Sequence, residues 1–344
     1  MRRKNLIALN HKDALKKNDI YKIYSKFKSQ LNKYTKNKPF TVAVSGGPDS
    51  LALTALSQIY RNQKKIKIYF VLIDHAIRKN SKKEANLVKK LLKRFGISLY
   101  VIRNKNKIKN NIQKKAREVR YKLLLNFCKR RKIRYILTAH HSDDQIETFL
   151  IRLSRGSGIQ GLSSMDKDIK LSKEVKLIRP LLEFKKQELK YIAKKSFGKV
   201  FKDPTNVNKK YLRTKVRSLK KQLEKSGIHH DQILRSINNL ASTRDTLNNY
   251  LKRVVQSSTK KVTDKVLVNL KEIKQESEEI KLKLLSMVIK NFSKSYYPPR
   301  SKKVLNVLKR LNSSKKTKLT LGGCLLEKSG NYLYITKEMP RKNH

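Results

Sequence analysis

Short runs of β-forming residues alternate with helical segments through roughly the first 200 residues of the chain. The runs are residues 40–44 (FTVAV), 66–73 (IKIYFVLI), 99–102 (LYVI) and 135–138 (YILT). Parallel strands need long crossover connections, and helices usually supply them. The pattern therefore predicts an α/β fold with an open, mainly parallel, doubly wound sheet, in which ligands bind beyond the carboxyl ends of the strands.

The chain is expected to divide into a helical lead-in, the sheet domain, a helical domain and a small C-terminal domain. These parts span residues 1–38, 39–205, 206–295 and 296–344. Apolar side chains recur at helical spacing between Ile20 and Leu31, which predicts the lead-in helix. After Asn206 the strand signal disappears, so residues 210–292 are expected to form several basic helices.

The C-terminal part combines a short helix with strand-forming segments. Residues 301–311 are expected to be helical, and residues 318–326 and 332–336 flank the turn residues Ser329-Gly330-Asn331. Turn residues between two such segments predict a β-hairpin. Because an isolated hairpin is marginally stable in water, we expect it to pack on another part of the chain.

The chain carries 85 Lys and Arg against 25 Asp and Glu, a net charge of +60. Such an excess favours a polyanionic partner, through counterion release and long-range attraction. An AT-rich genome would also encode many Lys, Asn and Ile residues, so a second explanation of the charge stays open. With 38% hydrophobic residues and 15 Tyr, the chain is expected to fold.

The two cysteines, Cys128 and Cys324, are far apart and form no CxxC pair, which excludes a disulfide framework. Apolar stretches such as residues 68–73 are much shorter than the about 20 residues that span a bilayer. The first apolar run of the chain is too short for a secretory signal. We therefore expect a cytoplasmic protein.

One segment of the sheet domain has the composition of a phosphate-binding loop. It follows the first strand, precedes a helix over residues 51–60, and consists of Ser45-Gly46-Gly47-Pro48-Asp49-Ser50. Glycines let backbone N–H groups turn inward, Pro48 suits a first helical turn, and the helix N-terminus favours an anion. Asp49 would repel a phosphate by itself, so its useful role is to bind the Mg²⁺ that accompanies a nucleotide. A tight turn with a helix cap is the plainer alternative, but it does not explain the whole segment.

This loop lacks the GxxxxGK[ST] pattern and resembles the SGGxDS loop of the N-type ATP pyrophosphatases, the PP-loop family. Members of that family split ATP between the α and β phosphates and attach AMP to a substrate oxygen. Further blocks, in order and covering residues 40–217, resemble the tRNA(Ile)-lysidine synthase family. They are residues 74–78 (DHAIR), 116–121 (AREVRY), 138–148 (TAHHSDDQIET), 155–158 (RGSG) and 179–182 (RPLL). Residues 319–324 (LTLGGC) resemble the C-terminal domain of the same family.

The resemblance implies a ligase that joins free L-lysine to the wobble cytidine of an isoleucine tRNA with a CAU anticodon, which then reads AUA instead of AUG. Lysine cannot expel the C2 oxygen of cytosine as oxide, so ATP first adenylates that oxygen and AMP becomes the leaving group. The cytidine must leave the anticodon stack to reach the nucleotide. The implied cofactors are ATP and Mg²⁺, and the implied partners are tRNA and lysine.

The resemblance also implies roles for individual residues. Asp49 and Asp144 are expected to bind Mg²⁺, although the sequence does not distinguish Asp143 from Asp144. Arg117 is expected to stabilise charge near the reacting phosphate or base, with a solvated helix face as its plainer alternative. Glu147, three residues after Asp144 on one predicted helix, is expected to bind an ammonium group of lysine.

Two histidines, His75 and His140, are expected to line the ATP site together with the loop. His75 could instead be a satisfied polar residue at a strand end. His140 could bind zinc with His141, although the HExxH spacing and a nearby cysteine are missing.

Residues 211–217 (YLRTKVR) resemble the RNxIR block of the lysidine synthase family, with Thr214 where Asn is usual. Arg213 and Arg217 lie one helical turn apart and are expected to contact tRNA through a phosphate or a splayed base. A homodimer stays open. Another PP-loop tRNA-modifying enzyme and a non-catalytic RNA-binding protein with a relic nucleotide site are the alternative functions. A cytidine thiolase needs cysteines for its sulfur chemistry, and the two cysteines of this chain are distant in the sequence.

Overall fold

The computed structural model forms two compact units, residues 1–241 and 242–344. None of the helices in the described ranges is both long and apolar enough to cross a membrane. The structure describes residues 18–78, 80–106, 108, 110–201, 212–295, 298–313 and 317–338.

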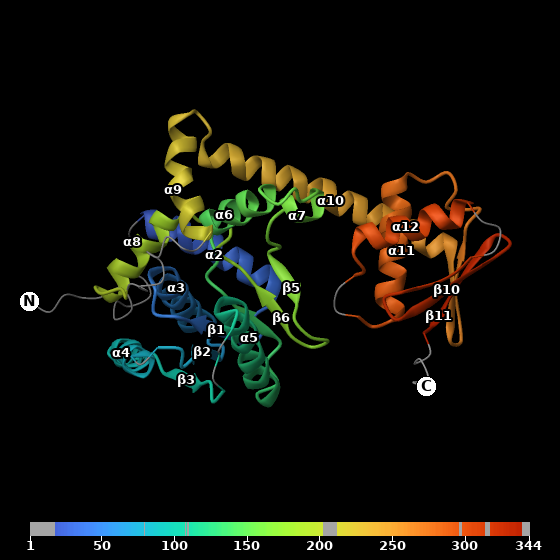
Figure 1. Cartoon of the computed structure of the whole chain (residues 1–344). Coiled ribbons are helices and arrows are strands. Elements are labelled where there is room, and N and C mark those ends of the chain that lie inside the picture. The colour runs from blue at the N-terminus through green and yellow to red at the C-terminus, as the bar shows by residue number, and fades with distance from the viewer. Residues whose placement is uncertain are drawn as a thin grey trace, which may run out of the picture. The chain divides into compact units, whose positions relative to one another are not determined.

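The first unit contains a six-stranded sheet with the order β3-β2-β1-β4-β6-β5 (Figure 1). Its strands are β1 (Phe40–Val44), β2 (Ile68–Asp74), β3 (Leu99–Arg103), β4 (Tyr135–Leu137), β5 (Asp168–Lys170) and β6 (Lys176–Ile178). Every pair is parallel except β5 with β6. The four predicted strands and the mainly parallel sheet are confirmed. The short strands β5 and β6 were not predicted, because three residues carry no recognisable alternation.

Helices cover both faces of this sheet. The described helices of this unit are α2 (Asn18–Thr35), α3 (Pro48–Lys64), α4 (Ser81–Lys93), α5 (Ile112–Arg130), α6 (Ser142–Leu153), α7 (Ile159–Leu162), α8 (Lys186–Phe197), α9 (Leu212–Lys225) and the start of α10 (His230–Ser258), of which α2, α3, α4, α5 and α8 pack on the sheet. Phe70 and Leu72 of β2 pack in one core with α2, α3, α4 and α8, whereas Val71 between them packs with α5 on the other face. Alternating side chains of one strand thus enter two cores, as a doubly wound sheet requires.

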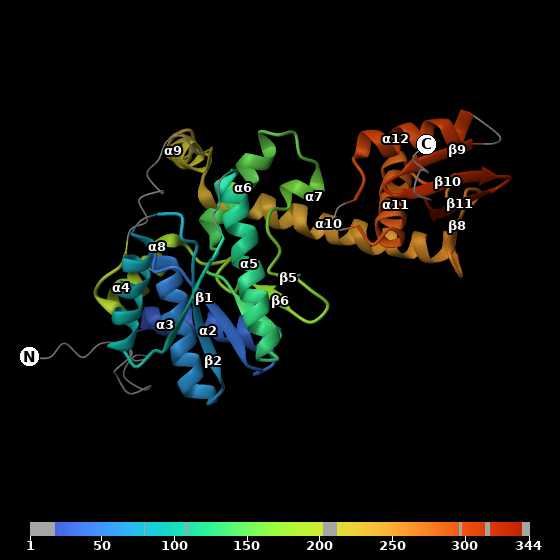
Figure 2. The ribbon, with the colours of Figure 1, turned by 60° about the horizontal axis from the view of Figure 1, so that its bottom comes forward.

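The second unit contains a five-stranded antiparallel sheet with the order β7-β8-β11-β10-β9. Its elements are β7 (Thr259–Val262), β8 (Lys265–Asn269), α11 (Glu278–Phe292), α12 (Ser301–Ser313), β9 (Thr317–Leu321), β10 (Cys324–Ser329) and β11 (Tyr332–Lys337). The helices α11 and α12 lie beside the strands (Figure 2) and share one apolar core with them. The predicted hairpin is confirmed as β10 and β11, with Ser329 opposite Tyr332.

Two expectations about the secondary structure of this part of the chain are corrected. Residues 210–292 are not all helical, since β7 and β8 lie within them. Residues 318–326 form two strands instead of one, because Gly322 and Gly323 have positive φ values of 63° and 77° and turn the chain.

The division between the compact units falls at 241/242 and not at 295/296, because β8 pairs with β11 and draws residues before 296 into the C-terminal sheet. The helix α9 and the start of α10 belong to the first unit, where Ile233 and Ile237 pack on Ile146 of α6. The predicted boundary at 205/206 lies outside the described residues.

Candidate functional site

The predicted phosphate-binding loop joins β1 to α3 at the carboxyl edge of the parallel strands. The Ser50 hydroxyl accepts a hydrogen bond from the Ser45 backbone N–H (3.1 Å) and donates one to the Gly47 carbonyl (3.0 Å). Gly46 has a φ of +85°, and a Cβ atom there would lie 2.6 Å from Cγ2 of Val88. A side chain at this position is therefore excluded both by its backbone conformation and by a clash. Pro48 occupies the first turn of α3, and the N-cap residue Gly47 has no side chain to bond the first N–H groups of the helix.

His141 lies between the two carboxylates predicted to bind metal. It is 2% exposed, and its Nε2 atom lies 3.5 Å from Oδ2 of Asp49 and 3.6 Å from Oδ2 of Asp144. Burial disfavours the charged imidazole, but a hydrogen bond to Asp49 and the nearby carboxylates outweigh it and raise the pKa of His141. One carboxylate oxygen, Oδ1 of Asp49, is buried without a hydrogen-bond partner among the described residues. The structure thus brings Asp49 and Asp144 to one histidine and leaves a carboxylate oxygen available there.

Asp143, the alternative metal ligand, is held by cations and donors from other helices. Its carboxylate accepts hydrogen bonds from Nζ of Lys220 (2.5 Å) and from the backbone N–H of Lys186 (3.2 Å), and lies 3.7 Å from Nε2 of His230. Burial opposes ionisation, but these partners outweigh it and lower the pKa of Asp143. Asp143 thus connects α6 with α8, α9 and α10.

Glu147 and Arg217, predicted for two different roles, form an ion pair. Nε of Arg217 donates to Oε1 of Glu147 at 2.5 Å, and its Nη2 atom lies 3.3 Å from Oε2. The Glu147 side chain is 6% exposed and that of Arg217 32% exposed. Burial disfavours the charged guanidinium, but the bond to Glu147 outweighs it and raises the pKa of Arg217. Arg213 lies one turn earlier on α9 and is exposed.

His75 lies after β2, next to α5. Oδ1 of Asp74 accepts a hydrogen bond from the Ala76 backbone N–H (2.9 Å) and fixes the turn that carries His75. Nε of Arg120 donates to Nε2 of His75 at 3.4 Å. Burial and the positive charge of Arg120 lower the pKa of His75 to about 4, against a smaller opposing effect of Asp74. His75 is therefore neutral at physiological pH, and its buried Nδ1 atom lacks a partner among the described residues.

His140 is influenced by the positive charges of several arginines. Its Nδ1 atom lies 2.9 Å from Oγ1 of Thr138, at the end of β4. Burial, followed by the positive charges of Arg179, Arg117 and further arginines, lowers its pKa well below the usual value. Arg117 is exposed and its guanidinium lies 5.1 Å from the centre of the Tyr121 ring. The charge of the predicted charge-stabilising Arg117 thus acts on the predicted nucleotide-binding His140.

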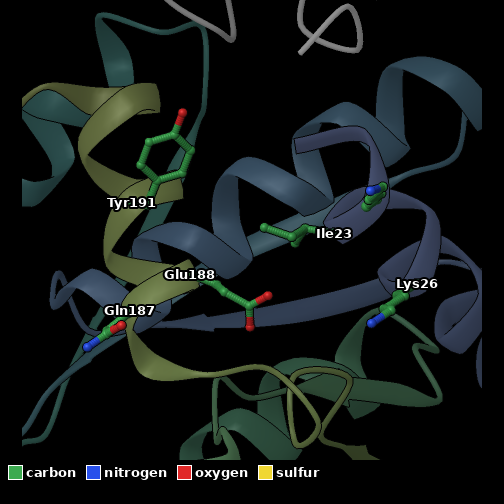
Figure 3. A pocket seen from close by; sticks show the side chains of 6 residues that line it. Ile23, Lys26, Gln187, Glu188 and Tyr191 are labelled. Carbon is green, nitrogen blue, oxygen red and sulfur yellow. The ribbon is translucent and has the colours of Figure 1, made fainter. Parts of the chain in front are cut away.

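The described residues contain no group of three or more His, Cys, Asp or Glu side chains with the arrangement of a metal centre, so nothing there supports zinc at His140 and His141. Cys128 and Cys324 are buried free thiols in different units. A hollow of about 440 Å³ lies between α2 and α8, with Glu188 and Lys26 directed into it (Figure 3). None of its lining residues belongs to the predicted site; they are Lys22, Ile23, Lys26, Gln187, Glu188 and Tyr191.

Sequence reasoning missed the partners of the acidic residues. Lys220 and His230 lie 77 and 87 residues after Asp143, and nothing in their local sequence marks them. Arg179 belongs to a block that carried the family resemblance, yet it was given no role. Its position directly after a strand, at the edge where the other candidates lie, is the signal that could have found it.

Comparison with known proteins gives relatives along most of the chain. Residues 20–223 match the family model described as a PP-loop domain. The chain is 36% identical to a tRNA(Ile)-lysidine synthase of Wolbachia pipientis, over 89% of this chain and 72% of the relative. It is 33% identical to a tRNA(Ile)-lysidine synthase of Orientia tsutsugamushi, over 90% of this chain and 71% of the relative. A solved U34-tRNA thiolase from Methanococcus maripaludis is similar in fold, with a TM-score of 0.55 and 20% identity, over 64% of this chain and 78% of that one.

Proposed function

Since the chain belongs to the tRNA(Ile)-lysidine synthase family of PP-loop proteins, we propose that it converts the wobble cytidine of a CAU-anticodon isoleucine tRNA to lysidine. In the first half-reaction the C2 oxygen of cytidine attacks the α-phosphate of ATP, and pyrophosphate leaves. In the second, an amine of free lysine attacks C2 and AMP leaves. The product reads AUA instead of AUG. The reaction requires ATP, lysine and tRNA together, which we expect in the cytoplasm.

The loop between β1 and α3 is our choice for the site of the ATP phosphates. Gly46 lets the backbone turn sharply, Ser50 fixes the loop internally, and the uncovered N–H groups of α3 face the anion. His75 and His140 border this edge, and both have lowered pKa values, so they are neutral and act as hydrogen-bonding groups. Neutral imidazoles can contact a base or ribose without repelling a cation.

Asp49 and Asp144 are the residues that would hold Mg²⁺. Carboxylate oxygens are the ligands that this ion prefers, and the buried, unpartnered Oδ1 of Asp49 fits a cation. Asp143 is the weaker candidate because Lys220 and Lys186 already occupy its oxygens. Bound Mg²⁺ would neutralise charge on the triphosphate.

Glu147 and Arg217 support a site for the second substrate. Glu147 is a buried carboxylate that already binds a cation, the guanidinium of Arg217. An ammonium group of lysine is a chemically similar partner, so we propose that lysine shares or takes the carboxylate. Arg217 and Arg213 lie one turn apart on α9, and we propose that both contact RNA, Arg213 from the exposed side of the helix.

The observation that carries the proposal is the juxtaposition of Asp49 on the loop with Asp144 and His141 at the start of α6. The test is incubation with ATP, radiolabelled lysine and an isoleucine tRNA with a CAU anticodon. Lysine should be incorporated into this tRNA and not into a variant whose wobble C is changed to U. RNA binding that needs no ATP and incorporates no lysine would instead indicate a non-catalytic RNA-binding protein.

A further inference from the structure

Arg179 is a buried cation that directly follows β6. The residue is 4% exposed, and its Nη1 atom donates a hydrogen bond to the backbone carbonyl of Asp166 at 2.6 Å. Its Nε–H is buried and has no hydrogen-bond partner among the described residues. Buried arginines are normally paired with a carboxylate, because an unpaired charge in the interior costs free energy. Arg179 makes no ion pair within the described part of the chain.

Other cations surround the same place. Burial is the largest cause of the lowered pKa of Arg179, and the charges of Arg117 and Arg152 lower it as well, whereas Tyr121 and Asp166 oppose this shift. Arg179 and Arg117 are also the two strongest charge effects on His140. Arg179 follows β6, Arg117 lies on α5 and His140 follows β4, so residues of three different elements contribute to the positive charge acting on His140.

This arrangement suits a phosphate group. A guanidinium presents a planar set of N–H donors that matches phosphate oxygens, and an anion would satisfy the unpartnered Nε–H and relieve the repulsion between arginines. In the sheet β4 lies between β1 and β6, so two strand spacings of about 4.8 Å separate β6 from the strand that carries the ATP loop. A phosphate bound by Arg179 is therefore beside the triphosphate loop.

We propose that Arg179, together with Arg117 and His140, forms a second binding site for a phosphate oxyanion beside the loop. This inference rests on the proposed function, under which two substrates carry phosphates. Because Arg179 lies beside the ATP loop and not on it, a phosphodiester of the RNA strand next to the wobble cytidine is the favoured ligand. The terminal phosphates of ATP are the other source of the same chemistry. Arg179 is thus an anion-binding residue that holds the cytidine strand or the nucleotide against the reacting centre.

The test measures binding of two ligands separately with Arg179→Gln and Arg179→Lys. An anticodon stem-loop RNA with a CAU anticodon is titrated at several salt concentrations, and ATP with Mg²⁺ is titrated alone. We expect Arg179→Gln to weaken RNA binding about tenfold and to reduce the slope of log affinity against log salt by about 0.7 to 0.9, the effect of one lost phosphate contact. Arg179→Lys should restore most of the slope, because it retains the charge.

The two arms distinguish the sources of the phosphate. A weaker ATP affinity with an unchanged RNA salt slope would support the site and assign it to ATP. Unchanged binding of both ligands to a folded Arg179→Gln protein would overturn the proposal. Arg94→Gln is the matched control, since Arg94 is exposed at the end of α4, before β3, and should leave both affinities unchanged.

A buried arginine can matter for folding, so thermal unfolding of each variant is measured first. If Arg179→Gln does not fold, Arg117→Gln provides the second test, because Arg117 is exposed and belongs to the same site. It should reduce the same salt slope or the same ATP affinity, and an effect on neither would overturn the proposal. Wild-type protein that binds RNA and ATP but incorporates no lysine contradicts the proposed function and leaves the phosphate site standing.

Discussion

Two halves of the candidate site differ in whether their charged groups are paired. Around the start of α6, Asp143 is paired with Lys220, Glu147 with Arg217, and His141 lies between Asp49 and Asp144. Around the end of β6, Arg179 has neither a carboxylate partner nor a complete set of hydrogen bonds among the described residues. One half is neutralised within the protein, and the other half presents uncompensated positive charge.

The difference separates two uses of charge. Paired groups in the acidic half connect α6 with α8, α9 and α10, so removal of one partner removes a stabilising interaction of a group that is at least partly buried. The positive half repels itself and becomes favourable when an anion binds. We therefore expect substitutions of the paired residues in the acidic half to lower stability and substitutions in the positive half to lower ligand affinity. Asp49 is the exception in the acidic half, because its substitution should mainly affect the reaction.

Asp49→Asn should have the largest effect, a loss of at least about 100-fold in tRNA-dependent pyrophosphate release, because a neutral amide stabilises a cation and the triphosphate poorly. RNA binding should stay close to that of the wild type. Pyrophosphate release from ATP and anticodon stem-loop RNA checks the first expectation, and a filter-binding assay checks the second.

Asp168→Asn is the matched control, since Asp168 is on the edge strand β5 and pairs with half-buried Lys176. This variant should release pyrophosphate at nearly the wild-type rate. Normal pyrophosphate release by Asp49→Asn would remove Asp49 from the metal and phosphate site.

Glu147→Gln comes next in expected size. Loss of the buried carboxylate should raise the KM for lysine about tenfold or more, since charge-assisted hydrogen bonds contribute about 1.5–3 kcal/mol. It also removes the carboxylate that pairs with half-buried Arg217, which should lower the free energy of unfolding by about 2 kcal/mol. Initial rates at varied lysine concentration and urea unfolding measure the two effects.

Arg217→Gln separates the effect on stability from the effect on lysine binding. The double variant Glu147→Gln/Arg217→Gln should lose less stability than the sum of the two single variants, because each single change already breaks the ion pair. An unchanged KM for lysine in Glu147→Gln would refute the lysine-binding role, whatever happens to stability.

Much of the fold and of the chemistry follows from local sequence. The strands β1 to β4 were predicted because apolar runs such as FTVAV mark buried parallel strands. The strands β7 and β8 were missed because lysines at positions 260, 261 and 265 obscure their apolar pattern. In the structure β8 pairs with β11 as well as with β7, so this lysine-rich hairpin is part of the larger sheet.

The contacts between side chains within the site could not be predicted from the sequence. Motif order placed Asp49, Asp144 and Glu147 at the carboxyl edge of the sheet, where the structure has them. That His141 lies between the first two carboxylates, and that Arg217 meets Glu147, depends on how α6 packs against α3 and α9. Such packing joins residues 70 or more positions apart, and spacing along the chain does not encode it.

The pH dependence of the free energy of unfolding, compared between the wild type and Asp143→Asn, tests whether the ionised carboxylate stabilises the fold. The partners of Asp143 lower its pKa from the usual 3.8, so the ionised carboxylate stabilises the folded state at pH values above about 4. This contribution is lost as the pH falls below 3.8 towards the lowered value. The wild type should therefore exceed Asp143→Asn by about 1–2 kcal/mol in free energy of unfolding at pH 7, and the gap should narrow below pH 4.

Urea unfolding of both proteins at pH 7, 5 and 3.5 measures this gap. Lys220→Met is the complementary variant, because it removes one cation and leaves the carboxylate in place. It should also lower stability at pH 7 and converge with the wild type in acid. A gap that stays constant from pH 7 to pH 3.5 would mean that ionised Asp143 does not contribute in the way the lowered pKa implies.

Arg213→Gln should have the smallest effect on stability and completes the contrast. Arg213 is exposed on α9, and its charge adds to the positive field on His140, so its removal should change the free energy of unfolding by less than about 0.5 kcal/mol. Affinity for the anticodon stem-loop should nevertheless fall several-fold, with a shallower salt dependence. Urea unfolding and RNA titration at two salt concentrations measure both quantities on one preparation. A stability loss above about 1 kcal/mol, as large as that of Asp143→Asn, would mean that the positive half is also structural and that the two halves do not differ.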